Sequence, residues 1–125
     1  MAGFRISRPA RADLEHILEL SLERRGEDGQ SRYRELLEAA LHVIASAPEG
    51  PMTRDRGLPG TGLRSFHLRH ARRAHGVHDP VHILYYRGTR AGSVEVVRIL
   101  HERMDPTAHL DAATQRRMPG KKRRP

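Results

Sequence analysis

Side chains that can move protons or hold a phosphate gather near the C-terminal end of the chain. His101, Glu102, Arg103, Asp105 and His109 follow one another closely. Metal-free cleavage of RNA needs a base for the 2′-hydroxyl proton, an acid for the leaving oxygen and cations for the charged intermediate. These residue types meet those needs. If the chain is a nuclease, the candidate catalytic residues are Arg64, Arg98, His101 and His109.

The same residues also have ordinary structural uses, which stay open at the level of sequence. Asp105 can cap a helix that starts at the following proline. Arg98 can form an ion pair with Glu95 or Glu102, and His101 can be a satisfied hydrogen-bond donor. The residue types alone therefore do not separate catalysis from structure.

Four histidines close in sequence raise the question of a metal site. His70, His75, His78 and His82 do not follow a recognised ligand spacing, and the chain has no cysteine to complete a structural site. The arginines beside them would repel a dication. Residues 57–62 are rich in glycine but lack the lysine and the strand-to-helix context of a phosphate-binding loop. The sequence predicts no metal and no cofactor.

The charge of the chain is strongly positive, but unevenly so. The formal net charge is +8, from 23 Lys and Arg against 15 Asp and Glu. Six of the cations lie in residues 116–125, which leaves +2 for residues 1–115. We expect acidic partners, a folded domain over residues 1–111 and a disordered basic tail over residues 112–125. No run of about 18 apolar residues or cleavable signal is visible, so a soluble cytoplasmic protein is expected.

Periodicity predicts two helices followed by three strands. A short strand at residues 4–7 leads into a helix capped by Ser7, and a break at Gly26 separates it from a second helix that stops at Pro48. A proline- and glycine-rich loop follows. Strands are expected at residues 63–68, 81–87 and 94–100, with a turn at 88–92 and an exposed excursion at 69–80. The expected fold is α+β, an N-terminal helical hairpin on a small antiparallel sheet.

Four sequence blocks in this order resemble the ParE branch of the ParE/RelE toxin superfamily. They are FRISRPARADLEHI at residues 4–17, GLRSF at 62–66, HILYYR at 82–87 and VVRILHERMDPTAHL at 96–110. The last block is the most specific and contains Arg98, His101, Met104, Asp105 and His109. The blocks span nearly the whole expected domain.

The resemblance implies the toxin of a type II toxin-antitoxin system with a cognate antitoxin, ParD-like or other, whose acidic C-terminal segment wraps it in a hetero-oligomer. It also implies DNA gyrase as the target of a non-enzymatic toxin. The alternative is a ribosome-dependent mRNA endoribonuclease of RelE type, which usually has a late tyrosine that is missing here after Tyr86. A third possibility is a module that only binds its antitoxin. The residues expected to contact antitoxin or target are Arg64, Tyr86, Arg98, His101, Arg103, Met104 and Asp105.

Overall fold

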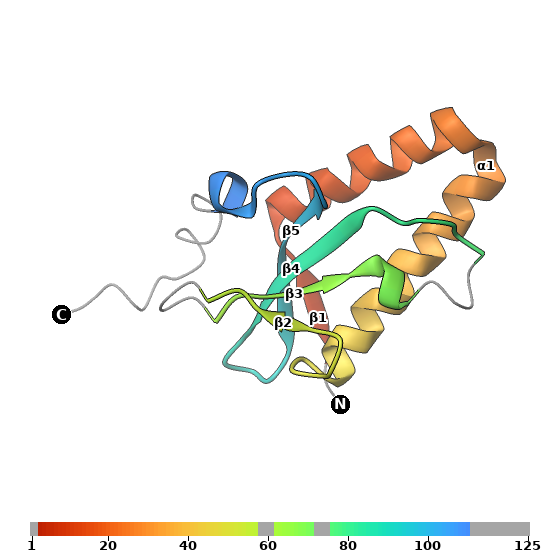
Figure 1. Cartoon of the computed structure of the whole chain (residues 1–125). Helices are drawn as coiled ribbons and strands as arrows, with labels where there is room; N and C mark the ends of the chain where they lie inside the picture. Colours follow the sequence, from red (N-terminus) through yellow and green to blue (C-terminus); the bar gives the residue numbers. More distant parts are fainter. Residues whose placement is uncertain (1–2, 58–61, 72–75, 111–125) are drawn as a thin grey trace.

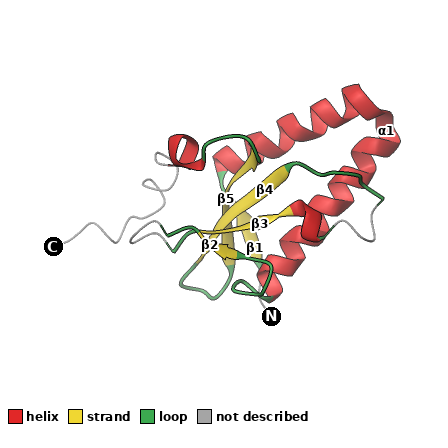
Figure 2. Cartoon of the chain, viewed as in Figure 1, coloured by secondary structure: helices red, strands yellow, loops and turns green. Residues whose placement is uncertain are grey.

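The computed structural model of the chain describes residues 3–57, 62–71 and 76–110. One long bent helix packs on a five-stranded sheet, which confirms the expected α+β class (Figures 1 and 2). In chain order the elements are β1 (Phe4–Ile6), α1 (Arg8–Ser46), β2 (Arg54–Asp55), β3 (Arg64–His67), the 3-10 helix η1 (Leu68–His70), β4 (His82–Gly88) and β5 (Val94–His101). A C-terminal helical turn follows at residues 106–110. The predicted tail, residues 112–125, lies outside the described residues.

The predicted helical hairpin is present as two limbs of α1. Ser7 caps the first limb, residues 8–25, because its hydroxyl accepts a hydrogen bond from the Ala10 amide. Within α1 only Gly26 leaves the helical conformation, with φ 75° and ψ −175°, and this single residue reverses the chain at the predicted break. The second limb, residues 27–46, returns beside the first, and Gln30 donates to the Leu18 carbonyl at 3.0 Å across the hairpin.

The sheet is mixed, which corrects the expectation of a purely antiparallel one. Its strand order is β1-β5-β4-β3-β2. The β3, β4 and β5 strands form the predicted antiparallel meander, but β1 pairs with β5 in parallel. In addition, β2 pairs with β3 inside the segment predicted to be a loop. The strand predicted at residues 4–7 is present as β1, but its parallel pairing with a segment some 90 residues away leaves no local pattern in the sequence. Strand β2 has only two residues, too few for periodicity to reveal it.

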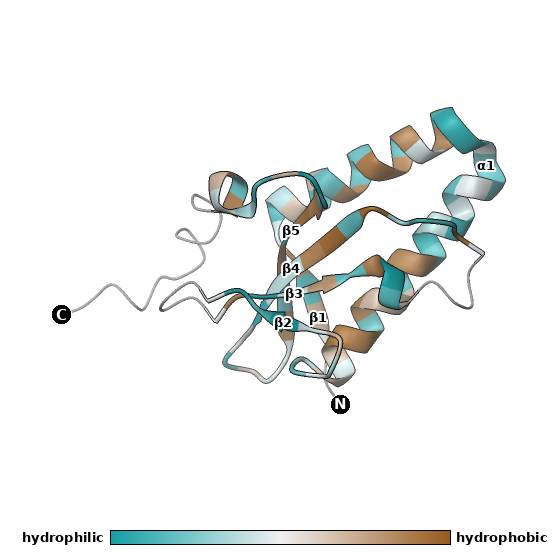
Figure 3. Cartoon of the chain, in the orientation of Figure 1, coloured by the Kyte–Doolittle hydropathy of each residue, from teal (hydrophilic) through white to brown (hydrophobic). Residues whose placement is uncertain are grey.

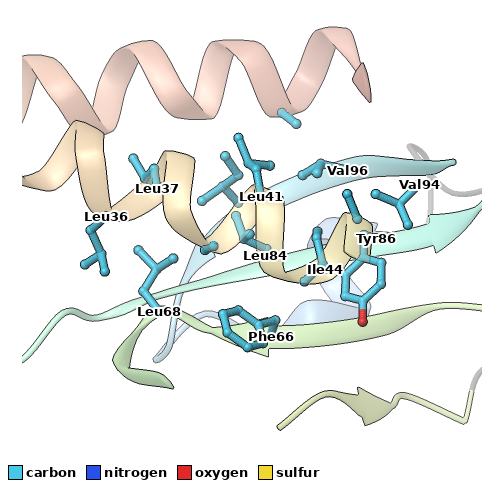
Figure 4. Packing of buried hydrophobic residues seen from close by; sticks show 14 of the residues in the cluster. Leu36, Leu37, Leu41, Ile44, Phe66, Leu68, Leu84, Tyr86, Val94 and Val96 are labelled. Carbon is cyan, nitrogen blue, oxygen red and sulfur yellow. The ribbon is translucent and has the colours of Figure 1, made fainter. Parts of the chain in front are cut away.

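The main core lies between α1 and one face of the sheet. The second limb supplies most of the helical side chains, and β3, β4 and β5 supply the rest (Figure 4). Figure 3 shows the alternation of hydrophobic and hydrophilic residues along α1 that this one-sided packing requires. The largest buried members include Leu36, Leu37, Ile44, Phe66, Leu68, Leu84 and Tyr86.

A second, smaller core covers the opposite face of the sheet, here called the far face. Leu110 of the C-terminal turn is fully buried there against Leu63, Tyr85, Val97 and Leu100. The turn starts as predicted, because the Asp105 carboxylate accepts a hydrogen bond from the Thr107 amide at 3.0 Å. In Figure 1 the turn lies across the sheet from the second limb of α1. Part of the far face is thus covered by the chain's own C-terminal residues.

The predicted excursion between β3 and β4 is only partly exposed. Arg69, His70 and His78 are exposed as expected. Val77, however, packs against the main core, and Pro80 is buried. The described part of this segment therefore helps to close the end of the molecule near the start of β4.

Candidate functional site

Arg98 joins three parts of the molecule. Its guanidinium donates to both carboxylate oxygens of Asp13, from Nε at 2.8 Å and from Nη2 at 2.9 Å. A third bond runs from Nη1 to the His109 carbonyl at 3.0 Å. The bond to Asp13 raises the pKa of Arg98 above its usual value. Arg98 therefore ties β5 to the first limb of α1 and to the C-terminal turn through bidentate, charge-assisted hydrogen bonds.

The expected partners of Arg98 were wrong. Glu95 and Glu102 do not hold it; Asp13, 85 residues earlier in the chain, does. The reason is a bulge in β5: Tyr85 pairs with Arg98 and Tyr86 with Val96, so that Val97 is an extra residue. A bulge re-aims the side chains that follow it. Because a bulge depends on pairing with a neighbouring strand, periodicity does not reveal it.

Asp13 is an important residue of this region that was not among the predicted site residues. Besides Arg98, its carboxylate accepts a hydrogen bond from the Ile99 amide at 2.9 Å. The Ser7 hydroxyl likewise donates to the Val97 carbonyl at 3.0 Å. Beyond the end of β1, the edge of β5 has no strand of the described chain beside it, and the side chains of Asp13 and Ser7 form hydrogen bonds with its backbone groups instead. The one available sequence signal was the presence of Asp13 in the first family-like block.

Arg64 and Tyr86 fasten the segment after α1 to the sheet. Arg64 donates to the Pro48 carbonyl at 3.1 Å and to the Thr53 hydroxyl at 2.7 Å. Tyr86 lies opposite Arg64 in the sheet, and its hydroxyl also donates to the Pro48 carbonyl. Tyr86 is 1% exposed, so its side chain does not lie on the surface where a partner could contact it. Its neighbour Tyr85 points to the opposite face of the sheet and is buried there as well.

The four candidate nuclease residues are not assembled into one site. In the sheet, Arg64 lies opposite Tyr86 and His101 lies opposite His82. Tyr86 and His82 are four residues apart along β4. Four residues of strand correspond to about 13 Å. Arg98 is turned toward Asp13, and His109 has its carbonyl bound by Arg98 while its side chain is exposed. Arg98 and the backbone of His109 therefore lie together, whereas Arg64 and His101 lie at opposite ends of the strands.

Histidines do meet at one end of the sheet, in a group that we call the histidine cluster: His67 of β3, His82 of β4 and His101 of β5, with Tyr33 of α1. The Tyr33 hydroxyl lies 2.6 Å from His82 Nδ1, and the rings of His82 and His101 meet edge to face at 5.7 Å. Burial lowers the pKa of His82 from 6.5 to about 4, and the nearby His101 adds to this effect. Burial raises the pKa of Tyr33 to about 12. At neutral pH the tyrosine therefore donates and the neutral imidazole accepts.

The outer part of the cluster is a carboxylate-histidine pair. His67 Nε2 lies 2.6 Å from Glu102 Oε1, and His67 Nδ1 accepts from the Arg69 amide at 3.0 Å. Both ring nitrogens of His67 are thus engaged, and the bond lowers the pKa of Glu102. His101 Nδ1 similarly accepts from the Arg103 amide at 3.1 Å. In this geometry His67 and His101 each fix a turn of the backbone.

A hollow of about 450 Å³ opens beside this pair. Polar side chains dominate its lining, which consists of His67, Arg69, His70, Asp79, Pro80, Val81 and Glu102. Within residues 3–57, 62–71 and 76–110, no group of three or more His, Cys, Asp and Glu side chains is arranged to hold a metal ion. His75, one of the four histidines considered above, lies outside the described residues.

The loop after β5 is the most accessible part of the predicted contact surface. Arg103, Met104 and Asp105 are all exposed, and Met104 is 44% exposed. The loop is anchored at both ends, since the Glu102 amide donates to the Val81 carbonyl at 2.7 Å and the Met104 amide to the His101 carbonyl at 2.9 Å. A held loop that presents one apolar side chain beside a cation suits the docking of a protein segment.

Comparison with known proteins gives a consistent result. The family model for the ParE toxin of the type II toxin-antitoxin system parDE matches residues 4–106. Toxin ParE1 of Caulobacter vibrioides is 34% identical over 111 residues, which cover 88% of this chain and 99% of that protein. Toxin ParE1 of Mycobacterium tuberculosis is 31% identical over 105 residues, covering 84% of this chain and 94% of that protein.

A solved structure has the same fold. The chain matches a structure of the chromosomal ParDE TA system from P. aeruginosa with a TM-score of 0.60 and 15% sequence identity. The match covers 81% of this chain and 96% of the other. No helix in the described part of this chain is long and apolar enough to cross a membrane.

Proposed function

Because the chain belongs to the ParE toxin family of type II toxin-antitoxin systems, we propose that it inhibits DNA gyrase and is neutralised by a cognate antitoxin. It acts in the cytoplasm, where it forms a hetero-oligomer with that antitoxin. The observation that carries the proposal is the state of Arg98, whose guanidinium is bound by the Asp13 carboxylate and by a backbone carbonyl. Such an arginine stabilises the fold and is not available to a substrate phosphate.

The alternative, a ribosome-dependent endoribonuclease, has less support from the geometry. A phosphate would have to displace a bidentate carboxylate from Arg98, and Arg64 is held by the Pro48 carbonyl and the Thr53 hydroxyl. General acid-base catalysis also needs its groups within hydrogen-bond reach of one substrate. Arg64 and His101 lie at opposite ends of the strands. A toxin that works by binding needs no such convergence.

The antitoxin contact is proposed at the loop after β5. Met104 supplies an apolar anchor, and Arg103 supplies charge complementarity to an acidic segment. Asp105 keeps the loop in place by capping the C-terminal turn. Buried Tyr86 and the internally bonded Arg64 and Arg98 support this surface from within and do not touch the partner.

The target is tested with purified free chain in two assays run side by side. Gyrase supercoiling of relaxed plasmid is expected to fall in proportion to added chain and to recover when the antitoxin is added in equimolar amount. Cleavage of mRNA in a translating extract is expected to stay at background. Undiminished supercoiling together with mRNA cleavage would overturn the proposal and establish the nuclease.

The docking loop is tested by substitution of its exposed methionine. Met104→Glu is expected to weaken antitoxin binding at least tenfold, because the apolar anchor is lost and a charge repels an acidic segment. Met52→Glu is the matched control, since Met52 is 54% exposed in the segment between α1 and β2. Isothermal titration measures both. Equal losses for the two variants, or none for Met104→Glu, would place the antitoxin elsewhere.

A further inference from the structure

Two turns in and beside the loop after β5 are closed by the same kind of hydrogen bond, from a backbone amide to the side chain two residues earlier. At Asp105 the acceptor is a carboxylate oxygen, which lies 3.0 Å from the Thr107 amide nitrogen. This is the usual form of such a turn, in which Asp or Asn supplies the oxygen. At His101 the acceptor is instead the ring nitrogen Nδ1, which lies 3.1 Å from the Arg103 amide nitrogen. An imidazole therefore takes the place of the usual Asp or Asn side chain.

This difference makes the turn at His101 sensitive to protons. A neutral imidazole has one acceptor nitrogen, whereas both ring nitrogens of a protonated histidine are donors. A protonated His101 would point an N–H group at the Arg103 amide, and the hydrogen bond between them would be lost. A carboxylate keeps its acceptor oxygens throughout the range of about pH 5 to 8 in which histidines change their charge. Acidification within that range therefore opens the turn at His101 and leaves the turn at Asp105 closed.

The groups packed around His101 belong to β4, β3 and α1. The ring of His82, on β4, meets that of His101 edge to face at 5.7 Å, and His82 in turn accepts from Tyr33 of α1. Burial lowers the pKa of His82 to about 4, so this ring stays neutral above about pH 5. Glu102 follows His101 in the chain, but its Oε1 is already bonded to His67 of β3 at 2.6 Å. Charges that act on these groups through space are those of Asp13, Arg25 and Arg69. No acid in the described part of the chain bonds to the His101 ring, so no ion pair there offsets the lost hydrogen bond.

The Arg103 amide lies between two fixed points of the loop. The Glu102 amide donates to the Val81 carbonyl at 2.7 Å, and the Met104 amide donates to the His101 carbonyl at 2.9 Å. These two bonds join backbone groups and do not titrate. The peptide of Arg103 is therefore the part of the loop whose position depends on a proton, and it directly precedes the exposed side chain of Met104.

We propose that His101 is a proton-operated switch of the loop formed by residues 102–105: protonation of its Nδ1 releases the Arg103 amide, changes how the loop presents Met104 and weakens antitoxin binding. The effect on binding rests on the proposed docking of the antitoxin at this loop, whereas the change in the loop itself does not. Because docking needs an uncharged His101, the complex binds fewer protons than the free chain, and affinity falls as the pH falls. Acidification would therefore free toxin from the complex.

Nuclear magnetic resonance of the free full-length chain, titrated from pH 7.5 to 5.5, tests the switch without the antitoxin. The Arg103 amide proton should move upfield and lose protection from hydrogen exchange, with the same midpoint as the ring protons of His101. The Thr107 amide, held by Asp105, is the internal control and should not follow that midpoint. In His101→Asn the side-chain oxygen can accept in place of Nδ1 without titrating, so the Arg103 amide should stay protected. An Arg103 amide that does not follow the His101 titration in the unaltered chain overturns the inference, whether or not the variant folds.

Isothermal titration with the antitoxin measures the consequence for binding. Salt of about 0.5 M screens the attraction between a charged His101 and an acidic segment, which would otherwise oppose the loss of the hydrogen bond. The Kd of the unaltered chain is expected to rise about threefold to tenfold from pH 7.5 to 5.5, and that of His101→Asn by less than about twofold. His78→Asn, the matched control, removes an exposed histidine outside the loop and should keep the full rise. Equal rises for His101→Asn and the unaltered chain contradict the inference.

The switch and the docking proposal fail separately. If Met104→Glu binds the antitoxin as tightly as the unaltered chain does, the docking proposal is wrong, and the Arg103 amide still decides whether His101 switches the loop. If Met104→Glu weakens binding but the Arg103 amide does not respond to pH, the docking proposal stands and the switch is wrong. Circular dichroism at each pH confirms that the variants are folded.

Discussion

At the scale of single residues, the side chains that look most reactive in the sequence are those that hold the fold together. Arg98 and Asp13 form a pair that is 21% and 15% exposed, and His101 and Asp105 each accept a hydrogen bond from a nearby backbone amide. The residue types indicate side chains that form ion pairs and hydrogen bonds, but they do not say which partner is within reach. The partner of Arg98 depends on a β-bulge and on a contact between residues that are 85 positions apart in the sequence.

The pair of Asp13 and Arg98 gives a test of this structural role. Asp13→Ala removes both bonds to the guanidinium and the acceptor of the Ile99 amide, and leaves a partly buried cation without its counterion. The free energy of unfolding should fall by about 2–3 kcal/mol, below the full cost for a completely buried pair. Urea unfolding measures it. Glu15→Ala, an exposed acid on the same limb, should cost under about 0.5 kcal/mol, and equal effects would refute the role.

His82 makes stability depend on pH in a defined window. Its pKa is about 4 in the folded chain, where burial disfavours the charged ring, whereas an unfolded chain protonates it near 6.5. Between these values the unfolded state binds more protons, so the free energy of unfolding should fall as pH drops from 6.5 to 4. His82→Gln keeps a hydrogen-bond acceptor for Tyr33 but does not titrate.

Melting temperatures at pH 7.5, 6.0 and 5.0 measure this dependence. His82→Gln is expected to show a smaller decrease with falling pH than the unaltered chain, even if it is less stable throughout. The exposed His78→Gln should retain the full decrease. An unchanged pH slope in His82→Gln would show that another group is responsible.

At the scale of elements, the local patterns were sufficient to predict β1, α1 and the meander, but not the parallel pairing of β1 or the existence of β2. The second limb of α1 buries an apolar stripe that repeats every three or four residues, and β3, β4 and β5 begin and end within a residue of the predicted strands. The stripe consists of Tyr33, Leu36, Leu37, Leu41 and Ile44. Strand β2 has two residues and no apolar alternation, so nothing in its sequence distinguishes it from loop. Its existence depends on the neighbouring β3.

The reversal of α1 depends on one glycine. Gly26 has φ 75° and ψ −175°, a region that only glycine occupies easily, and a Cβ there would meet nothing within 4 Å. Gly26→Ala should therefore cost about 1–3 kcal/mol of stability through backbone strain alone, without a steric clash. Chemical denaturation measures the loss. Gly88→Ala, also in open space but without positive φ, serves as the control, and a neutral Gly26→Ala would mean that the bend can re-form elsewhere.

At the scale of the whole molecule, the sheet separates an acidic helical side from a basic side that the C-terminal turn covers. Net charge alone pointed to acidic partners but could not show this division, because arginines from β1, β2 and β4 come to lie on one face only when the sheet forms. The family-like block at residues 96–110 is the part that joins the two sides. Arg98 reaches α1, while Leu110 closes the far face.

Two truncations of the chain test whether the residues that stabilise the fold are different from those that carry most of the net charge. A chain that ends at residue 115 keeps Leu110 and the His109 carbonyl, and loses only the six cations of residues 116–125. Its formal charge falls from +8 to +2, which reduces self-repulsion, so its melting temperature should stay within about 2 °C or rise slightly at low salt.

A chain that ends at residue 105 should behave differently. It loses Leu110, exposes Leu63, Tyr85, Val97 and Leu100 of the far face, and removes one acceptor of Arg98. Loss of a buried leucine costs about 2–5 kcal/mol, and each kcal/mol lowers the melting temperature of a domain this size by about 4–8 °C. Thermal unfolding followed by circular dichroism should therefore show a decrease of more than about 10 °C at both low and high salt. A comparable decrease for the chain ending at residue 115 would mean that residues 116–125 also stabilise the fold, which contradicts this prediction.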